Sequence, residues 1–177
     1  MEVLLEQNDR SVGGKDFDLT SRHFLFRKAA RAVILDHEGM VGLMHLKKRG
    51  IYKLPGGGVD RGETIMQALI REVKEEVGVG FGEFKELGIT LESRYYEGDD
   101  HGLFQMTYAY LVKLKGEKGV ADFTEEEQSE GASVIWLPKD EALDVVKNYP
   151  FPDYESHFIK QRELRILQEA AKFWHEF

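Results

Sequence analysis

A glycine-rich loop that leads directly into an amphipathic helix constrains this chain more than any other feature of its sequence. The loop runs over residues 54–64 and holds three consecutive glycines after Pro55. Thr64 can cap a following helix because Gln67 stands three residues later in the capping-box relation, and Gly78 suits the position after the last turn. The pattern predicts a helix over residues 65–77. Its apolar stripe is formed by Met66, Leu69, Val73 and Val77.

Strand-like segments flank this loop and helix on both sides. Apolar runs and alternation predict strands over residues 24–35, 40–46, 84–96, 103–114 and 133–137. The first two suggest a hairpin around residues 36–39, and the next two a second pair around residues 97–102. Helices are expected near 140–148 and over 154–175, separated by Pro150 and Pro152. We therefore expect a mixed α and β fold.

The length of the chain favours a single domain. The 177 residues are near the usual size of one compact unit with one core. We expect residues 1–177 to form one domain, with residues 1–20 as an N-terminal extension and 154–176 as a C-terminal helix. That helix carries enough apolar bulk to fold back onto the sheet or, alternatively, to contact a second copy in a homodimer.

Composition excludes several classes of protein. The formal charge is −8, which disfavours nucleic-acid binding by bulk charge. The absence of cysteine excludes disulfides, thiolate metal sites and cysteine nucleophiles, and it is compatible with a reducing cytosol. No window approaches the roughly 20 apolar residues of a membrane span. The N-terminal residues lack a basic n-region, so no signal or transit peptide is expected and the protein is predicted to be cytoplasmic.

Three glutamates crowd one side of the predicted helix. Glu72, Glu75 and Glu76 fall on an arc next to the apolar stripe, where like charges repel one another. A hard divalent cation such as Mg²⁺ would offset that repulsion, because it binds carboxylate oxygens and bridges to substrate phosphates. The alternative is a solvated acidic face that is partly neutralised by Arg71 and Lys74.

The preceding loop favours phosphate chemistry. Consecutive glycines, including Gly57 and Gly58, expose backbone N–H groups and permit close approach. Lys48 lies just upstream, between Lys47 and Arg49, and could meet phosphate oxygens. Taken separately, the glycines are compatible with an ordinary turn and the basic residues with a solvated strand end. Their combination with the acidic helix favours a phosphate site.

These residues match a family signature. Gly57, five residues, Glu63, seven residues, Arg71-Glu72-Val73, one residue, Glu75-Glu76, one residue and Gly78-Val79 reproduce the Nudix box at every fixed and hydrophobic position. The chain thus resembles Nudix hydrolases over the box, and over about residues 24–148 by the order of its elements.

The resemblance implies a fold and an activity. The expected fold is an α/β/α sandwich around a mixed sheet, and the expected reaction is hydrolysis of a nucleoside diphosphate linked to another moiety, with Mg²⁺ or Mn²⁺. By the same resemblance, Glu72, Glu75 and Glu76 would bind the metal. Arg71 and Glu63 would orient the catalytic helix, and Gly57 would admit the phosphates of a small nucleotide substrate.

A later carboxylate is also expected from the resemblance, often in a loop before a strand that contains tryptophan. Glu130, six residues before Trp136, is the first candidate, and Glu127 is the second. The alternative for this acidic run is a solvated loop. Whether the general base is Glu75, Glu130 or another residue stays open.

The substrate is determined mostly outside the box. A nucleobase needs an apolar or aromatic slot with a few polar groups. Candidate linings are Phe24, Phe26, Tyr95, Tyr96, Phe104 and Tyr108. Nucleoside triphosphates, dinucleoside polyphosphates and nucleotide sugars all remain candidate substrates.

Two other function classes compete with hydrolysis. A related branch of the family isomerises isopentenyl diphosphate with an active-site cysteine, and the absence of cysteine argues against it. A catalytically silent nucleotide-sensing or partner-binding module is the other alternative, although such modules have lost the glutamates of the box.

Overall fold

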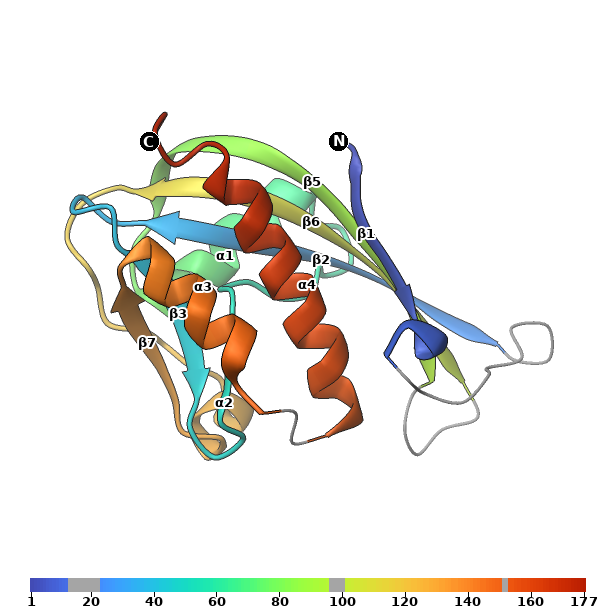
Figure 1. The fold of residues 1–177 in the computed structure, drawn as a ribbon. Helices are drawn as coiled ribbons and strands as arrows, with labels where there is room; N and C mark the ends of the chain where they lie inside the picture. Colours follow the sequence, from blue (N-terminus) through green and yellow to red (C-terminus); the bar gives the residue numbers. More distant parts are fainter. Residues whose placement is uncertain (13–22, 96–100, 151–152) are drawn as a thin grey trace.

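The computed structural model describes residues 1–12, 23–95, 101–150 and 153–177. These residues form a seven-stranded mixed sheet with helices packed against it (Figure 1). The strand order is β1-β5-β6-β2-β3-β4, and β7 pairs with β3. The β1–β5 and β2–β6 pairs are parallel, and the other pairs are antiparallel. The strands are β1 (Val3–Asn8), β2 (Phe24–Leu35), β3 (Val41–Leu46), β4 (Ile51–Lys53), β5 (Phe81–Tyr95), β6 (Gly102–Leu114) and β7 (Ala132–Leu137).

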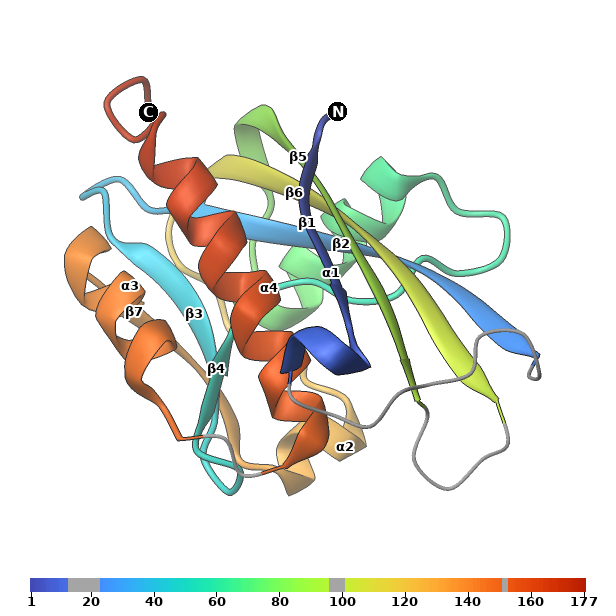
Figure 2. The ribbon, with the colours of Figure 1, turned by 45° about the vertical axis from the view of Figure 1, so that its right-hand side comes forward.

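Helices cover both faces of this sheet. Figures 1 and 2 show α1 behind the sheet, and α3 and α4 together on the opposite side. The helices are α1 (Ile65–Val77), α2 (Glu125–Ser129), α3 (Lys139–Asn148) and α4 (Tyr154–Ala171), with a short 3₁₀ helix, η1 (Asp9–Val12), after β1. Among the described residues, no helix is long and apolar enough to cross a membrane.

The capping residues set both ends of α1, as predicted. The Thr64 side chain accepts from the backbone N–H of Gln67 at 3.2 Å, and the Gln67 side chain accepts from the backbone N–H of Thr64 at 2.8 Å. Gly78 follows the last turn with φ 78°, a left-handed conformation that favours glycine. The helix therefore begins directly after the glycine loop, which keeps the two segments in contact.

Alternation along β2 divides the interior into two cores. Ala32 and Ile34 pack with α1, whereas Val33 and Leu35 face α3 and α4. The same alternation places Arg31 on the α4 face, where its Nε lies 3.6 Å from a carboxylate oxygen of Glu163 in α4.

Several elements differ from the sequence-based expectation. Residues 3–8, expected only as part of an extension, form β1 on the edge of the sheet. The short elements β4 and α2 were not predicted, since three and five residues are too few to show a period. The expected hairpin exists only next to its turn, through Ile34–Gly42 and Leu35–Val41. Further along the same edge of β2, residues 55–59 take the place of β3, because the Ala30 and Ala32 N–H groups donate to carbonyl oxygens of the glycine loop. Most of the turn expected over residues 97–102 lies outside the described residues.

The C-terminal helix folds back onto the sheet. Ile166 and Leu167 are fully buried in the core that also contains Val33 and Leu35. The apolar side chains of this helix are thus buried by the rest of the same chain, as the sequence favoured.

Candidate active site

Arg71 is the centre of the polar contacts on α1. Its guanidinium donates two hydrogen bonds to the Glu63 carboxylate, from Nε at 2.8 Å and from Nη2 at 3.0 Å. Nη2 also donates to the carbonyl oxygen of Gly58 at 3.0 Å. The hydrogen bonds from Arg71 lower the pKa of Glu63 to about 2, and Glu63 in turn raises the pKa of Arg71. This bidentate pair joins the loop to the helix.

The same guanidinium offsets the repulsion within the acidic arc. Nη1 of Arg71 donates to Glu72 Oε1 at 2.8 Å and to Glu75 Oε2 at 3.2 Å. Arg71 therefore supplies part of the positive charge that a divalent cation was expected to bring to these glutamates. Arg71 is held by glutamates on three sides, which fixes its position.

The glycine loop packs closely against two of the helix glutamates. A Cβ atom at Gly57 would overlap the carboxylate of Glu72, so only glycine fits there without displacing that side chain. The backbone N–H of Gly56 donates to Glu76 Oε2. A Cβ at Gly58 would only reach ordinary contact, 3.4 Å from Arg27 Nη2. The loop thus positions carboxylates in addition to any phosphate it admits.

Glu76 differs from its neighbours because it is buried. It is 2% exposed, and burial raises its pKa to about 7 despite Lys53 and Arg31 nearby. Lys53 Nζ lies 3.5 Å from Glu76 Oε1 and 3.4 Å from Glu127 Oε1. Burial acts to raise the pKa of Glu127, but Lys53 and hydrogen bonds outweigh it, so that pKa is lowered. At neutral pH Glu127 is ionised while Glu76 titrates.

The two candidates for the later carboxylate lie in different surroundings. Glu127 on α2 meets Lys53, which also contacts Glu76. Glu130 caps the end of α2 and lies 3.8 Å from Arg49 Nη1, while its carbonyl oxygen accepts from the backbone N–H of Lys48 at 3.0 Å. The structure therefore places Glu127 beside Lys53, across from Glu76, and Glu130 beside Arg49.

The donor set fits a hard divalent cation, although its side chains do not converge as placed. Within the described part of the chain, no three Asp, Glu or His groups meet at metal-binding spacing. Glu76 Oε1 is nevertheless buried with no hydrogen-bond partner among the described residues. An unsatisfied buried carboxylate oxygen within one helical turn of two further carboxylates suits oxygen-seeking Mg²⁺ or Mn²⁺.

Comparison with known proteins decides the family. The family model of the NUDIX domain matches residues 25–160. The chain belongs to the Nudix hydrolase family. The predicted membership of this family, and with it the predicted Nudix-type hydrolase, is confirmed. Members of this family use divalent cations.

Individual relatives agree with this assignment. The chain is 28% identical over 166 residues to an RNA pyrophosphohydrolase of Rhodopseudomonas palustris, which covers 83% of this chain and 93% of that protein. It is 50% identical over 48 residues to Nudix hydrolase 10 of Arabidopsis thaliana, which covers 27% of this chain but only 17% of that protein. The crystal structure of MutT from Bacillus halodurans is 25% identical with a TM-score of 0.53, over 67% of this chain and 72% of that one. The mixed α and β Nudix fold is thus confirmed.

Sequence reasoning missed Lys53 and Gly56 in this Nudix site. Both contact Glu76, yet neither belongs to a spaced signature. Lys53 comes from β4, whose side-chain directions depend on its pairing with β3. The only signal for Lys53 in the sequence was its position two residues before Pro55, and that spacing does not predict a role in the site.

Proposed function

We propose that this protein hydrolyses a phosphoanhydride bond in a nucleoside diphosphate linked to another moiety. The observation that carries the proposal is that Arg71 and the glycine loop contact the glutamates of the complete box. Arg71 joins Glu63, Glu72 and Glu75, and the glycine loop packs against Glu72 and Glu76. A small-molecule nucleotide is the proposed substrate.

Glu72, Glu75 and Glu76 would hold Mg²⁺ or Mn²⁺. When bound, the cation supplies neutralisation of phosphate charge and a water of lowered pKa. Glu76 contributes a desolvated oxygen that has the Lys53 ion pair but no hydrogen bond among the described residues, which favours exchange of its proton for a cation.

The other residues of the box hold the carboxylates in place. Arg71 fixes Glu72 and Glu75 while Glu63 fixes Arg71, so a positioning role follows for both Arg71 and Glu63. Gly57 leaves the space that the Glu72 carboxylate occupies. Preorganised groups of this kind lower the reorganisation needed in the transition state.

The proton released by the attacking water needs an ionised carboxylate. We assign this role to Glu127, because its lowered pKa keeps it ionised and it shares Lys53 with Glu76. Glu75 and Glu130 are the competing residues. Glu127→Gln should reduce kcat more than Glu130→Gln or Glu75→Gln does, and it should remove the acidic limb of the pH–rate profile, where protonation of the base lowers the rate. The reverse order of kcat values would reassign the base.

The test is a substrate panel in ¹⁸O water. The protein with Mg²⁺ is incubated with nucleoside triphosphates, dinucleoside polyphosphates and nucleotide sugars, and the mass of each product locates the attacked phosphorus. A triphosphate-ended oligoribonucleotide is included because the R. palustris relative is named an RNA pyrophosphohydrolase. Release of a labelled phosphate product is expected from at least one small nucleotide.

Matched variants separate hydrolysis from silent nucleotide sensing. Glu76→Gln should lose at least about 100-fold in turnover with the fold intact. Glu83→Gln changes an exposed glutamate of β5 and should keep full activity. Binding of nucleotide without any cleavage, in wild type and variants alike, would establish the sensing module instead.

A further inference from the structure

A polar cavity lies on the α4 side of the sheet, next to the proposed active site. It has a volume of about 260 Å³, and its only apolar lining residues among those described are Leu46, Phe158 and Ile159. We call it the arginine cavity, after Arg31, Arg94 and Arg162 in its lining. Whole-ligand sites usually occupy roughly 300–1,000 Å³, so this cavity suits one part of a substrate.

The lining brings together charged side chains of both signs, with one more cation than carboxylates, in a protein that is acidic as a whole. Six of the 24 Lys and Arg residues line the cavity, together with five glutamates, in a chain whose formal charge is −8. The three arginines that give the cavity its name are 7%, 6% and 3% exposed in chain order. Buried charges of this kind require partners, because desolvation of an unpaired ion is costly.

One of these arginines is fully paired. Arg162 donates from Nη1 to Glu92 Oε1 at 3.0 Å and from Nη2 to Glu163 Oε1 at 2.8 Å. Burial acts to lower the pKa of Arg162, but the two glutamates outweigh it and the pKa is raised. The buried carboxylates of Glu92 and Glu163 are thus already paired with Arg162.

Arg31 lacks such compensation. Its Nε and Nη1 atoms are buried without a hydrogen-bond partner among the described residues, and the nearest carboxylate oxygen, on Glu163, is 3.6 Å from Nε. Burial lowers the pKa of Arg31, and Glu163 does not offset it. Arg94 Nε is likewise unsatisfied. A buried donor without a hydrogen-bond partner is costly, and an anion in the cavity would supply the missing acceptor.

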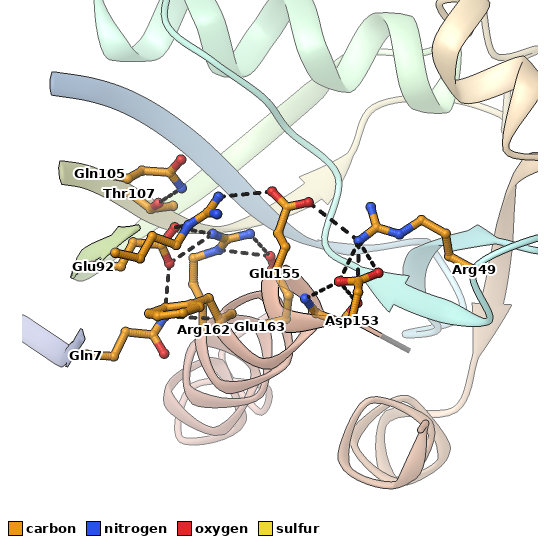
Figure 3. Close-up of polar contacts among 12 residues, drawn as sticks. Gln7, Arg49, Glu92, Gln105, Thr107, Asp153, Glu155, Arg162 and Glu163 are labelled. Carbon is orange, nitrogen blue, oxygen red and sulfur yellow. Dashed lines mark hydrogen bonds and ion pairs between the residues drawn. The ribbon is translucent and has the colours of Figure 1, made fainter. Parts of the chain in front are cut away.

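A carboxylate from the edge of the cavity already approaches these cations. Glu155, in the first turn of α4, accepts from Arg94 Nη2 at 2.9 Å and lies 3.5 Å from Arg49 Nη2. Figure 3 shows Glu155 between Arg49 and the group formed by Glu92, Arg162 and Glu163. Its side chain is 45% exposed, so it can leave this position without opening the core.

The cavity is continuous with the groups around the catalytic helix. Lys53 lines the cavity and lies 3.5 Å from Glu76 Oε1. Arg27 also lines it and stands next to Gly58 of the loop. A substrate whose scissile bond lies at α1 can therefore extend toward Arg31.

We propose that the arginine cavity binds a phosphate group of the substrate that is not part of the hydrolysed bond, with Arg31 and Arg94 as its ligands and Glu155 as the group it displaces. The inference rests on the proposed function and narrows its substrate class. Nucleotides with additional phosphates, as in triphosphates and dinucleoside polyphosphates, are selected over nucleotide sugars whose second moiety is neutral. Arginine suits this role because its planar fork binds phosphate oxygens in pairs.

Binding of inorganic pyrophosphate to the metal-free chain of residues 1–177 tests this without any hydrolysis. Calorimetry in chelator compares wild type with Arg31→Met, Glu155→Gln and the control Arg165→Met, which alters an α4 arginine bonded to the Leu4 carbonyl. Arg31→Met should weaken binding about tenfold or more, and Glu155→Gln should strengthen it. The control should leave it unchanged. Equal binding by wild type and Arg31→Met, or weaker binding by Glu155→Gln, would overturn the proposal.

Kinetics distinguish recognition from a structural role. In Arg31→Met, KM for a dinucleoside polyphosphate should rise about tenfold or more while KM for a nucleotide sugar is unchanged. Equal losses for both substrates would show that Arg31 only supports the fold. If the wild type hydrolyses nothing but pyrophosphate binding still depends on Arg31, the proposed hydrolysis fails and the anion site stands.

Discussion

Lys53 Nζ lies 3.5 Å from Glu76 Oε1 and forms the only ion pair of that buried carboxylate within the described part of the chain. The lysine does not fully compensate for burial, because the pKa of Glu76 is still raised to about 7. Metal-free protein therefore holds a proton on this carboxyl group at mildly acidic pH. Stability and cation binding become linked through that proton.

The metal-free protein should lose stability as pH rises through about 7. The folded-state pKa of Glu76 is raised above its ordinary value of 4.5, so its stabilising contribution is complete below that value and is lost as pH rises through the folded pKa. The loss is on the order of 3 kcal/mol. Chemical denaturation in chelator, from about pH 5 to about pH 8, measures it.

Glu76→Gln provides the reference for that measurement, since glutamine does not titrate. Wild type should become less stable relative to the variant as pH rises through the pKa of Glu76, because only the wild-type side chain gains a buried charge. Parallel pH curves for the two proteins would show that Glu76 keeps an ordinary pKa.

Loss of the Arg71–Glu63 pair should weaken the metal site. Glu63→Gln keeps the shape of the side chain but removes the charge that holds Arg71, so Glu72 and Glu75 lose their fixed position. Partners that orient metal ligands are typically worth about 10–100-fold in metal affinity or activity. Titration of Mn²⁺ into the variant and into Glu83→Gln measures the effect, and equal affinities would remove the positioning role.

Adding a methyl group at Gly57 should displace Glu72. The new Cβ would overlap its carboxylate, so Gly57→Ala should reduce Mn²⁺ affinity and turnover together. Gly58→Ala is the matched control, because its Cβ reaches only ordinary contact at 3.4 Å. We expect about a tenfold or larger loss of Mn²⁺ affinity in the first variant only, by analogy with other groups that orient ligands. Similar losses in both variants would point to a general change of the loop.

The packing of α1 should depend on its buried stripe. Leu69 is fully buried against the sheet, so Leu69→Ala should lower the unfolding free energy by about 2–5 kcal/mol. Ile70, its neighbour, is 48% exposed, and Ile70→Ala should cost much less. Thermal denaturation at one pH compares the two, and equal destabilisation would contradict the observed orientation of the helix.

Local signals made part of the site predictable. Thr64, Gln67 and Gly78 set the ends of α1 through contacts within a few residues, and the structure keeps them. The resemblance to the Nudix box likewise implied the pair of Glu63 and Arg71, which a loop and one helix can form alone. Short-range contacts of this kind can be predicted from the sequence because both partners lie within two helical turns or one loop.

The placement of the later acidic residues was not predictable in the same way. Glu130 ranked above Glu127 by its distance in sequence from Trp136, yet α2 turns Glu127 toward Lys53 and Glu130 toward Arg49. The predicted aromatic slot also has no counterpart in the arginine cavity, none of whose lining residues comes from that set. Tyr96, one of its members, lies outside the described residues.

The amino-acid sequence by itself determined the loop, the helix and the order of carboxylates along it, because capping, glycine freedom and helical period act over a few residues. Only the tertiary structure decided which of those carboxylates is buried and which cations face it. Glu76 meets Lys53 from β4, and Arg31 from β2 meets α4, more than a hundred residues away along the chain. Such long-range contacts depend on strand pairing and on the side of the sheet that each helix covers. The burial that shifts the pKa of a side chain arises only after those elements pack.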